Sequence, residues 1–474
     1  MQDVELVDVD GTSAARDGVA PARRHRRAGR PGGGQPTARR WAVVAITVAL
    51  VAGGAVGAGL AAGGDPARPR TAAGMLRPVD DPPWTRWRAP VTRSEDLLAA
   101  EGVLLAASVR EGRFRVTAWD VVTGGRRWDQ DLGPAAGTRP LTGCLPDPDG
   151  TSDVVVCVVE PPVVATDPAH PSTVPFPAPD ERWARVSALD AATGAVRSTF
   201  TLVGRLAAVE RLADDVVVLS IAPDGHPQVA RYSAEGGHLR WWYRGAEPLR
   251  LRSGIVSGSE LRVDDAFVLV QGWSASVLDA ADGSVITTGT PRWYTIGALA
   301  QGVFGTWSSG QGGTVRDRSG KELFRSSALF PSFTATDRRP SDVLVLDSGG
   351  SVVGRSLPDG DELWRLDTYR AARLRVDGKL VLVGVDGYQV VDVRTGDVLW
   401  QTPGQTLMWW APLTDGRLVL SAGRTGSGAS TIEARRLVDG VLEWSLPVPD
   451  GVRAVTEVGG HLVLRTRDEI LLLQ

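Results

Sequence analysis

Eight times along this chain a short apolar run ends in a turn that contains glycine, and in most copies an aromatic residue stands four positions after that glycine. The turn glycines are Gly124, Gly194, Gly236, Gly283, Gly320, Gly360, Gly396 and Gly440. The copies recur at spacings of roughly 36 to 47 residues, with one copy delayed to about 70. Self-similarity at such a period indicates a repeat architecture, in which each unit buries its apolar face only against its neighbours.

Each repeat contains the pattern of four short strands. An alternating strand precedes the turn glycine, and an apolar run such as DDVVVLS or DGKLVLVG comes before that strand. This succession of strands and tight turns predicts one four-stranded antiparallel blade per repeat. Glycine suits the turn because it adopts a positive φ that a β-carbon would oppose.

The residues that follow the glycines are large and aromatic, and each would bury about 150 to 250 Å². They are Trp128, Phe200, Trp241, Phe324, Trp364, Trp400 and Trp444. We expect them to dock between adjacent blades, as core residues and not as parts of a cofactor site.

The two ends of the repeat region complement each other. DEILLLQ at the C-terminal end has the pattern of a third blade strand without a fourth, and PPWTRWRAPV near residue 84 has that of a fourth strand without a third. Their pairing would close a ring and remove its sheet edges. A content of 56 Gly and 31 Pro also favours short strands and tight turns over a helical bundle. We therefore expect an all-β propeller over residues 84–474.

Residues 41–63 carry no charge and would extend roughly 34 Å as a helix, enough to cross a hydrocarbon core of about 30 Å. Eight arginines crowd the first forty positions, whereas only Arg68, Arg70 and Arg77 follow shortly after the apolar segment. The positive-inside rule then places the N-terminus in the cytoplasm and the chain from about residue 64 outside. We expect a single-pass protein of the cell membrane, with an extracytoplasmic propeller and a linker over 64–83.

A cleaved signal peptide is the alternative for this segment, because residues 59–63 are rich in small residues and Arg39-Arg40-Trp41 faintly resembles a twin-arginine signal. The forty-residue polar leader and the length of the apolar stretch favour a retained anchor. The basic leader, residues 1–40, has too little apolar content to fold alone and is expected to be disordered. Gly53-xxx-Gly57 and Gly59-xxx-Gly63 would permit a weak dimer through the span, although a lipid-facing helix is the simpler interpretation.

The chain has two cysteines, Cys144 and Cys157, on either side of a turn-rich segment. An external compartment is oxidising, so we expect a disulfide that closes a hairpin and adds roughly 3 kcal/mol of stability. No CxxC pair or neighbouring histidine completes a metal site. Asp147, Asp149 and Asp153 suggest a calcium loop but lack the spacing of an EF-hand, which favours a solvated hairpin tip.

The motif A-x-D-x-x-T-G-x-x-x-W spans residues 118–128 and recurs in a close variant over 188–200. It resembles the tryptophan-docking repeat of the pyrroloquinoline-quinone (PQQ) β-propellers, and the resemblance covers about residues 84–474. That family implies eight blades, while the repeats plus the composite closing unit give nine. We expect eight, with nine as the alternative.

Members of the family that this chain resembles are either quinone-dependent dehydrogenases or non-enzymatic propellers, such as the scaffold subunit that helps assemble outer-membrane proteins. The dehydrogenases carry adjacent cysteines against the cofactor ring and a calcium ion held by Glu, Asn and Asp. Here Cys144 and Cys157 are separated, the chain has no clear calcium set, and a haem-attachment CxxCH is missing. We therefore expect no cofactor, no metal and no catalytic residue.

Other catalytic patterns are weak. The extracytoplasmic histidines His170, His226, His238 and His461 are scattered, with no GxSxG or HExxH motif to organise them, and we interpret them as surface residues. Five carboxylates recur at one place in the repeat, namely Asp120, Asp190, Asp279, Asp317 and Asp392. Their recurrence indicates hydrogen bonding at turns and not a single catalytic pair.

Three functions remain. The favoured hypothesis is a membrane-anchored, non-catalytic binding or scaffold module for a protein or cell-envelope ligand, which its loops would contact. The alternatives are a PQQ-dependent alcohol or sugar dehydrogenase and a transmembrane sensor that reports ligand occupancy to the leader. The propeller region is acidic once the basic leader is set aside, which argues against a nucleic-acid partner.

Overall fold

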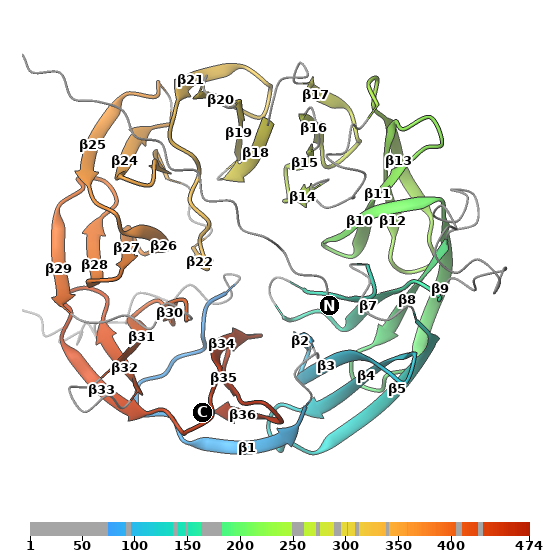
Figure 1. The fold of residues 1–474 in the computed structure, drawn as a ribbon, viewed down its shortest axis with the longest axis horizontal. Helices are drawn as coiled ribbons and strands as arrows, with labels where there is room; N and C mark the ends of the chain where they lie inside the picture. The colour runs from blue at the N-terminus through green and yellow to red at the C-terminus, as the bar shows by residue number, and fades with distance from the viewer. Residues whose placement is uncertain are drawn as a thin grey trace, which may run out of the picture. The chain divides into compact units, whose positions relative to one another are not determined.

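A computed structural model gives the fold of this chain (Figure 1). The structure describes residues 74–91, 96–135, 141–147, 150–162, 183–248, 260–271, 275–288, 295–300, 302–308, 312–337, 341–357, 359–403, 410–424 and 430–474. The chain divides into two units, Met1–Gly63 and Gly64–Gln474, and the described residues all belong to the second. The predicted leader and span lie outside these residues, and no helix within them is long and apolar enough to cross a membrane.

The described part of the second unit consists of nine β-sheets placed around a central axis, as blades of a propeller (Figure 1). Blade 1 contains β2 (Asp96–Ala100), β3 (Val103–Arg110), β4 (Arg113–Asp120) and β5 (Arg126–Pro134), and blade 2 contains β6 (Gly143–Leu145), β7 (Val154–Val159), β8 (Trp183–Asp190) and β9 (Val196–Val203). Blade 3 contains β10 (Arg205–Leu212), β11 (Asp215–Ile221), β12 (Pro227–Ser233) and β13 (Leu239–Arg244), and blade 4 contains β14 (Glu260–Val263), β15 (Phe267–Gln271), β16 (Ala275–Asp279) and β17 (Val285–Thr288).

The remaining blades follow in chain order around the ring. Blade 5 contains β18 (Thr295–Ala300), β19 (Val303–Ser308), β20 (Gly312–Arg316) and β21 (Glu322–Ser326), and blade 6 contains β23 (Val343–Asp347), β24 (Ser351–Ser356) and β25 (Glu362–Asp367). Blade 7 contains β22 (Ala335–Thr336), β26 (Ala371–Val376), β27 (Lys379–Gly384), β28 (Gly387–Asp392) and β29 (Val398–Pro403), and blade 8 contains β30 (Leu413–Thr414), β31 (Leu418–Arg424), β32 (Ser430–Arg436) and β33 (Leu442–Pro447). Blade 9 contains β34 (Ala454–Val458), β35 (His461–Arg465), β36 (Glu469–Leu473) and β1 (Thr85–Pro90).

The expectation of eight blades is wrong, because the described residues form nine. Each of the eight glycine turns joins the last two strands of one blade, and the composite blade 9 adds one more. Repeats that contact only their neighbours can close with a different number of units, since each joint is a local contact. The number of repeats in the sequence, with the composite closing unit, therefore predicted the number of blades better than the eight blades usual in the family.

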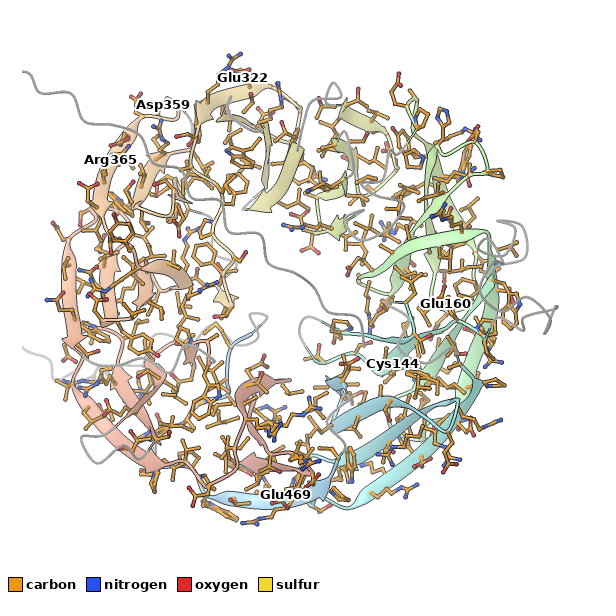
Figure 2. All side chains as sticks on the ribbon, viewed as in Figure 1. Cys144, Glu160, Glu322, Asp359, Arg365 and Glu469 are labelled. Carbon is orange, nitrogen blue, oxygen red and sulfur yellow. A yellow bond between two sulfur atoms is a disulfide. The ribbon has the colours of Figure 1, made fainter. Side chains whose placement is uncertain are left out.

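Blade 9 closes the ring from the two ends of the repeat region, which confirms the predicted pairing. β1 runs antiparallel to β36, from Thr85 opposite Leu473 to Pro90 opposite Glu469. The Trp84 and Gln474 backbones exchange two hydrogen bonds of 3.0 and 3.1 Å. Glu469 marks this seam on the outer rim (Figure 2). The pairing satisfies backbone groups that two free edges would leave unpaired.

The apolar core lies between neighbouring blades. One cluster joins Leu105 and Val116 of blade 1 to Val155 and Leu189 of blade 2, and similar clusters follow around the ring. A register shift, or β-bulge, interrupts the pairing of the last two strands in each of blades 1 to 8. Bulges of this kind re-aim a side chain and increase the local twist.

Blades 6 and 7 depart from the regular pattern. Blade 6 has three strands, and Leu329, which would belong to a fourth, makes only an isolated bridge to Asp347. The chain then continues to β22, which pairs in parallel with β26 of blade 7 and gives that blade five strands.

Candidate functional site at the ring closure

A tryptophan at the end of one blade forms each regular joint by packing on the turn of the next blade. Its indole Nε1 donates a hydrogen bond to a backbone carbonyl beside that turn. These bonds run from Trp87 to Val121 (2.9 Å), Trp128 to Ala191 (2.9 Å), Trp241 to Ala280 (3.1 Å), Trp364 to Val393 (2.7 Å) and Trp400 to Leu437 (3.0 Å). Each indole therefore contributes both buried apolar surface and a polar contact that fixes its direction.

The turn glycines lie directly against these rings. A β-carbon at Gly396, where φ is +75°, would lie 2.6 Å from Cγ of Trp364. One at Gly194, with φ +72°, would lie 2.6 Å from Cδ2 of Trp128. Glycine is therefore required twice at these positions, for its backbone conformation and for the close approach of the ring.

Three joints differ from this pattern. Phe200 packs on Gly237 and not on Gly236, although both glycines of this doublet have positive φ. Phe324 packs on Gly360, and Gly320 lies against Ile286, which stands where the repeat lacks an aromatic residue. Phenylalanine and isoleucine retain the apolar contact without an N–H donor.

The recurring aspartates lie within the turns. Asp120 accepts the backbone N–H groups of Val122 and Thr123, and Arg127 also donates to it. The hydrogen bond from the Thr123 backbone, followed by that from Arg127, lowers the pKa of Asp120 to about 2. Arg197, and then Thr193, lower the pKa of Asp190 to about 2 in the same way. These hydrogen bonds hold the turns that carry the glycines.

Blade 9 has no such turn, because its last two strands come from distant parts of the chain. A segment that we call the strap, residues 75–82, occupies that place. Trp444 donates its Nε1 to the Val79 carbonyl at 3.1 Å, and the Val79 N–H donates to Asp415 Oδ2 at 3.1 Å. Leu76 N–H donates to the Thr414 carbonyl at 2.7 Å. The strap therefore makes the joint between blades 8 and 9.

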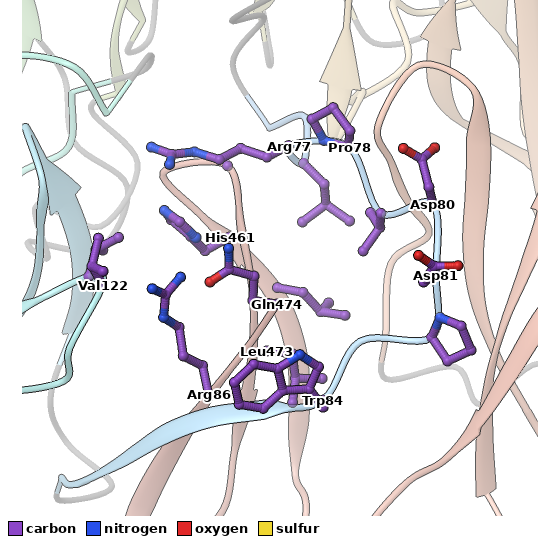
Figure 3. A pocket seen from close by; sticks show the side chains of 16 residues that line it. Arg77, Pro78, Asp80, Asp81, Trp84, Arg86, Val122, His461, Leu473 and Gln474 are labelled. Atoms are coloured by element: carbon purple, nitrogen blue, oxygen red, sulfur yellow. The ribbon is translucent and has the colours of Figure 1, made fainter.

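A pocket of about 480 Å³, the closing-blade pocket, lies between the strap, blade 9 and the edge of blade 1 (Figure 3). It is lined by Leu76, Arg77, Pro78, Val79, Asp80, Asp81, Pro82, Trp84, Arg86, Val121, Val122, Gly460, His461, Leu462, Leu473 and Gln474. It exists because the chain enters the ring here by way of the strap, where the other blades have a turn. Its volume falls within the range of about 300 to 1,000 Å³ that is typical of ligand sites.

The charges of the closing-blade pocket are divided between two sides (Figure 3). Arg77 and Arg86 lie with His461 on one side, and Asp80 and Asp81 lie across from them on the strap. Asp80 accepts a hydrogen bond of 2.8 Å from Arg417. Within the described part of the chain, neither Arg77 nor Arg86 makes an ion pair.

His461 is the most unusual residue of this pocket. Its side chain is buried, with 9% of the residue exposed, and its Nε2 has no hydrogen-bond partner among the described residues. Burial, and then the positive charges of Arg77 and Arg86, lower its pKa to about 4. The interpretation of His461 as a surface residue is therefore wrong, because residues distant in sequence cover it.

The other histidines considered in the sequence are not known to share the buried, positively charged surroundings of His461. His226 is hydrogen-bonded through Nδ1 to the Gly245 carbonyl at 2.8 Å, and His238 lies beside Gly236. His170 lies outside the described residues. They do not come together with His461 in one site.

Sequence reasoning missed the residues that build the closing-blade pocket. Arg77 and the strap belong to a segment that we expected to be a linker, and Trp87 was not among the predicted docking residues. The TRW triplet on the composite fourth strand was the available signal for Trp87, since tryptophans end the other blades. The strap carries no repeat motif that would have indicated its position.

The predicted disulfide is confirmed. Cys144 and Cys157 are bonded to each other across β6 and β7, with their Cα atoms 3.9 Å apart. Both are buried in the cluster between blades 1 and 2. Among the described residues, no three His, Cys, Asp or Glu side chains gather into a set that could hold a metal ion. Because Cys144 and Cys157 lie on separate strands, they do not fit the adjacent cysteines of a quinone dehydrogenase.

The nine sheets and their tryptophan joints define the chain as a β-propeller of the PQQ-like type. The family described as "Outer membrane protein assembly factor BamB" matches residues 113–292 and 182–391, which together cover more than half of the chain. The chain therefore belongs to this family of BamB-type propellers. A search of curated proteins gave no match.

Solved structures that are similar to this chain at low sequence identity include the following three. BamB from Moraxella catarrhalis is 14% identical, with a TM-score of 0.43, over 83% of this chain and all of that one. The quinohemoprotein alcohol dehydrogenase ADHIIG from Pseudomonas putida HK5 is 13% identical, with a TM-score of 0.41, over 86% and 80% of the two chains. A europium-containing methanol dehydrogenase is 11% identical, with a TM-score of 0.35, over 76% and 86%.

Proposed function

We propose that this protein is a membrane-anchored, extracytoplasmic propeller that acts as a non-catalytic binding or scaffold module for a protein or cell-envelope ligand. The observation that carries the proposal is the closing-blade pocket, which brings together two arginines without ion pairs among the described residues, an exposed indole and a buried imidazole. Such groups suit recognition of a ligand, and the paired strands of blade 9 fix the positions of Arg86 and His461.

Two observations support the location outside the cytoplasm. The Cys144–Cys157 disulfide is of a kind that persists in oxidising compartments. The arginines before residues 41–63 favour a span whose C-terminal side is outside. A Tyr369→Cys variant tests this, because Tyr369 is 92% exposed. A membrane-impermeant maleimide should label it in intact cells, and labelling only after lysis would contradict the proposed topology.

Site-specific photo-crosslinking in cells tests the binding role. A crosslinking amino acid is placed at one of four exposed positions, Trp84, Val203, Tyr369 or Val385. Trp84 and Val203 lie in separate parts of the ring, whereas Tyr369 and Val385 adjoin the ion-paired residues Arg370 and Asp386 of blade 7. A scaffold that binds one partner through one surface should give a discrete adduct from one or two neighbouring positions only. Equal, diffuse adducts from all four, or none above background, would contradict the proposal.

A second measurement separates binding from quinone chemistry. Because a cofactor that binds only the folded state raises its stability, PQQ with calcium should shift the melting temperature of a dehydrogenase. We expect no shift for the full-length chain, since the described residues do not fit that site. A saturable shift would overturn the non-catalytic part of the proposal.

A further inference from the structure

The closing-blade pocket contains an imidazole without a hydrogen-bond partner. Nε2 of His461 is buried, and its neighbours in the pocket are two arginines that lack ion pairs within the described residues. A buried polar atom without a partner costs about 1 to 3 kcal/mol. Folded proteins contain few buried polar atoms without a hydrogen-bond partner, and such an atom is explained when a ligand supplies the missing partner.

The arrangement of the charges indicates the chemistry of that ligand. The Arg77 and Arg86 guanidinium groups lie above and below the imidazole of His461 in the view of Figure 3. Guanidinium groups bind carboxylates and phosphates through paired N–H donors. A neutral imidazole between them adds a donor or an acceptor, according to its tautomer.

The opposite side of the pocket distinguishes between these two anions. Asp80 and Asp81 lie there, and because Asp80 is paired with Arg417, Asp81 supplies most of the repulsion. This repulsion is stronger for a doubly charged phosphate than for a singly charged carboxylate. The Asp81 carboxylate also suits the N–H groups of a peptide backbone, which are donors only. Trp84, 64% exposed, offers apolar surface to side chains.

We propose that the closing-blade pocket binds a peptide through a carboxylate held between Arg77 and Arg86, with His461 beneath it. The carboxylate comes either from the end of a chain or from an acidic side chain, and the experiment separates these sources. The pocket is formed by strap, blade 9 and blade 1 together, so a bound peptide contacts both sides of the ring closure. This inference rests on the proposed binding function and names the ligand chemistry of its site.

The experiment measures fluorescence anisotropy of three dansylated peptides with the full-length chain in detergent micelles. They are Ala-Ala-Ala with a free carboxyl end, the same peptide as its amide, and Ala-Glu-Ala amide. At least tenfold tighter binding of the free acid than of its amide supports a chain end. A comparable advantage of Ala-Glu-Ala amide supports a side-chain carboxylate. No advantage of either over Ala-Ala-Ala amide overturns the inference.

Variants assign the binding to the pocket. Arg77→Gln and Arg86→Gln should each weaken the tighter peptide tenfold or more, because each removes one of the two guanidinium partners. Arg88→Gln is the matched control, since it lies on the same strand as Arg86, loses the same charge and does not line the pocket. It should change affinity by less than twofold. Equal weakening by Arg86→Gln and Arg88→Gln would show a general charge effect and overturn the assignment.

Two further outcomes are informative. Inorganic phosphate and acetyl-Ala-Ala-Ala are compared as competitors of the bound peptide. If phosphate displaces the peptide at concentrations as low as those at which acetyl-Ala-Ala-Ala does, the site is not selective for a carboxylate and the inference is contradicted. Failure of this inference can also be distinguished from failure of the proposed function. If no carboxylate peptide binds while crosslinks form at Val203 or Val385 in cells, the pocket assignment fails and the scaffold role stands.

Discussion

Gly396 and Trp364 show how a single pair of residues joins two blades. The glycine adopts φ +75° so that the turn can form, and the absence of a side chain lets the indole of Trp364 lie flat on the turn. The indole N–H then reaches the Val393 carbonyl of the same turn at 2.7 Å. One contact thus combines a conformational requirement, a packing requirement and a hydrogen bond.

These requirements can be separated with two alanine variants in the same blade. Gly396→Ala and Gly378→Ala both place a β-carbon at positive φ, but at Gly378 nothing lies within 4 Å of that carbon. Each variant should lose about 1 to 2 kcal/mol from the backbone alone. Gly396→Ala should lose a further 1 to 3 kcal/mol or so, because Trp364 must move. Urea denaturation of the full-length chain measures this, and equal losses would show that the ring contact contributes nothing.

His461 makes the stability of the fold dependent on pH. Its pKa is about 4 in the folded chain, against an ordinary value near 6.5, because burial and the Arg77 and Arg86 charges disfavour the imidazolium. Between these values the unfolded chain binds more protons than the folded chain. Stability from this residue is therefore complete above about pH 6.5 and is lost as the pH falls toward 4.

Comparison of the wild type with His461→Gln isolates this effect, since glutamine retains polarity but does not ionise. From pH 7 to pH 5 the free energy of unfolding of the wild type should fall by about 2 kcal/mol more than that of the variant. Other titrating groups, such as Glu210 and Glu457, whose pKa burial raises, are common to both proteins and cancel. Parallel pH curves for the two proteins would contradict the assignment.

Among the elements of the ring, the strap makes a joint without being a strand. Strands of the blades are held by ladders of backbone hydrogen bonds, whereas the strap relies on separate bonds to Thr414, Asp415, Gly460 and Trp444. Segments held by few bonds open more readily than paired strands. The strap is therefore the element of the ring closure that we expect to open first.

Trp444→Phe and Trp400→Phe form a matched pair for testing this. Each removes one indole N–H at a joint, from Val79 in one case and from Leu437 in the other. Both should lose about 1 kcal/mol, because each leaves a partly buried carbonyl without its hydrogen-bond donor. In hydrogen–deuterium exchange, only Trp444→Phe should accelerate exchange at the amides of Leu76, Arg77 and Val79. Acceleration of these amides in both variants would mean that the strap responds to global stability and not to its own joint.

For the molecule as a whole, the repeat motif was sufficient to predict a propeller. Eight glycine turns and a composite blade add up to the nine blades observed, and the DEILLLQ and PPWTRWRAPV segments pair as expected. The disulfide followed from two cysteines flanking a turn. These features were predictable because each depends on residues near one another in sequence or on a pattern that repeats.

The pocket was not predictable for the opposite reason. It forms where the repeat is interrupted, from Arg77 on the strap, Val122 of blade 1 and His461 of blade 9. No motif links these positions, and the burial of His461 depends on residues almost four hundred positions away. The Gly236–Gly237 doublet shows the same limit on a small scale, since either glycine fits the motif and only packing against Phe200 selects the second.

The pairing of β1 with β36, which closes the ring, joins residues further apart in sequence than any other strand pair of the described residues. It should therefore gain the most from a covalent link. A Pro90→Cys, Glu469→Cys pair joins positions that face each other across β1 and β36 and encloses residues 90–469. A Gln228→Cys, Arg244→Cys pair across β12 and β13 encloses residues 228–244 only. Chain entropy predicts stabilisation of about 6 kcal/mol for the first and about 3 kcal/mol for the second. Urea midpoints of each oxidised protein against its reduced form measure the difference. Equal gains would show that β1 and β36 of blade 9 remain paired in the unfolded ensemble, so that unfolding does not open the ring at this pair.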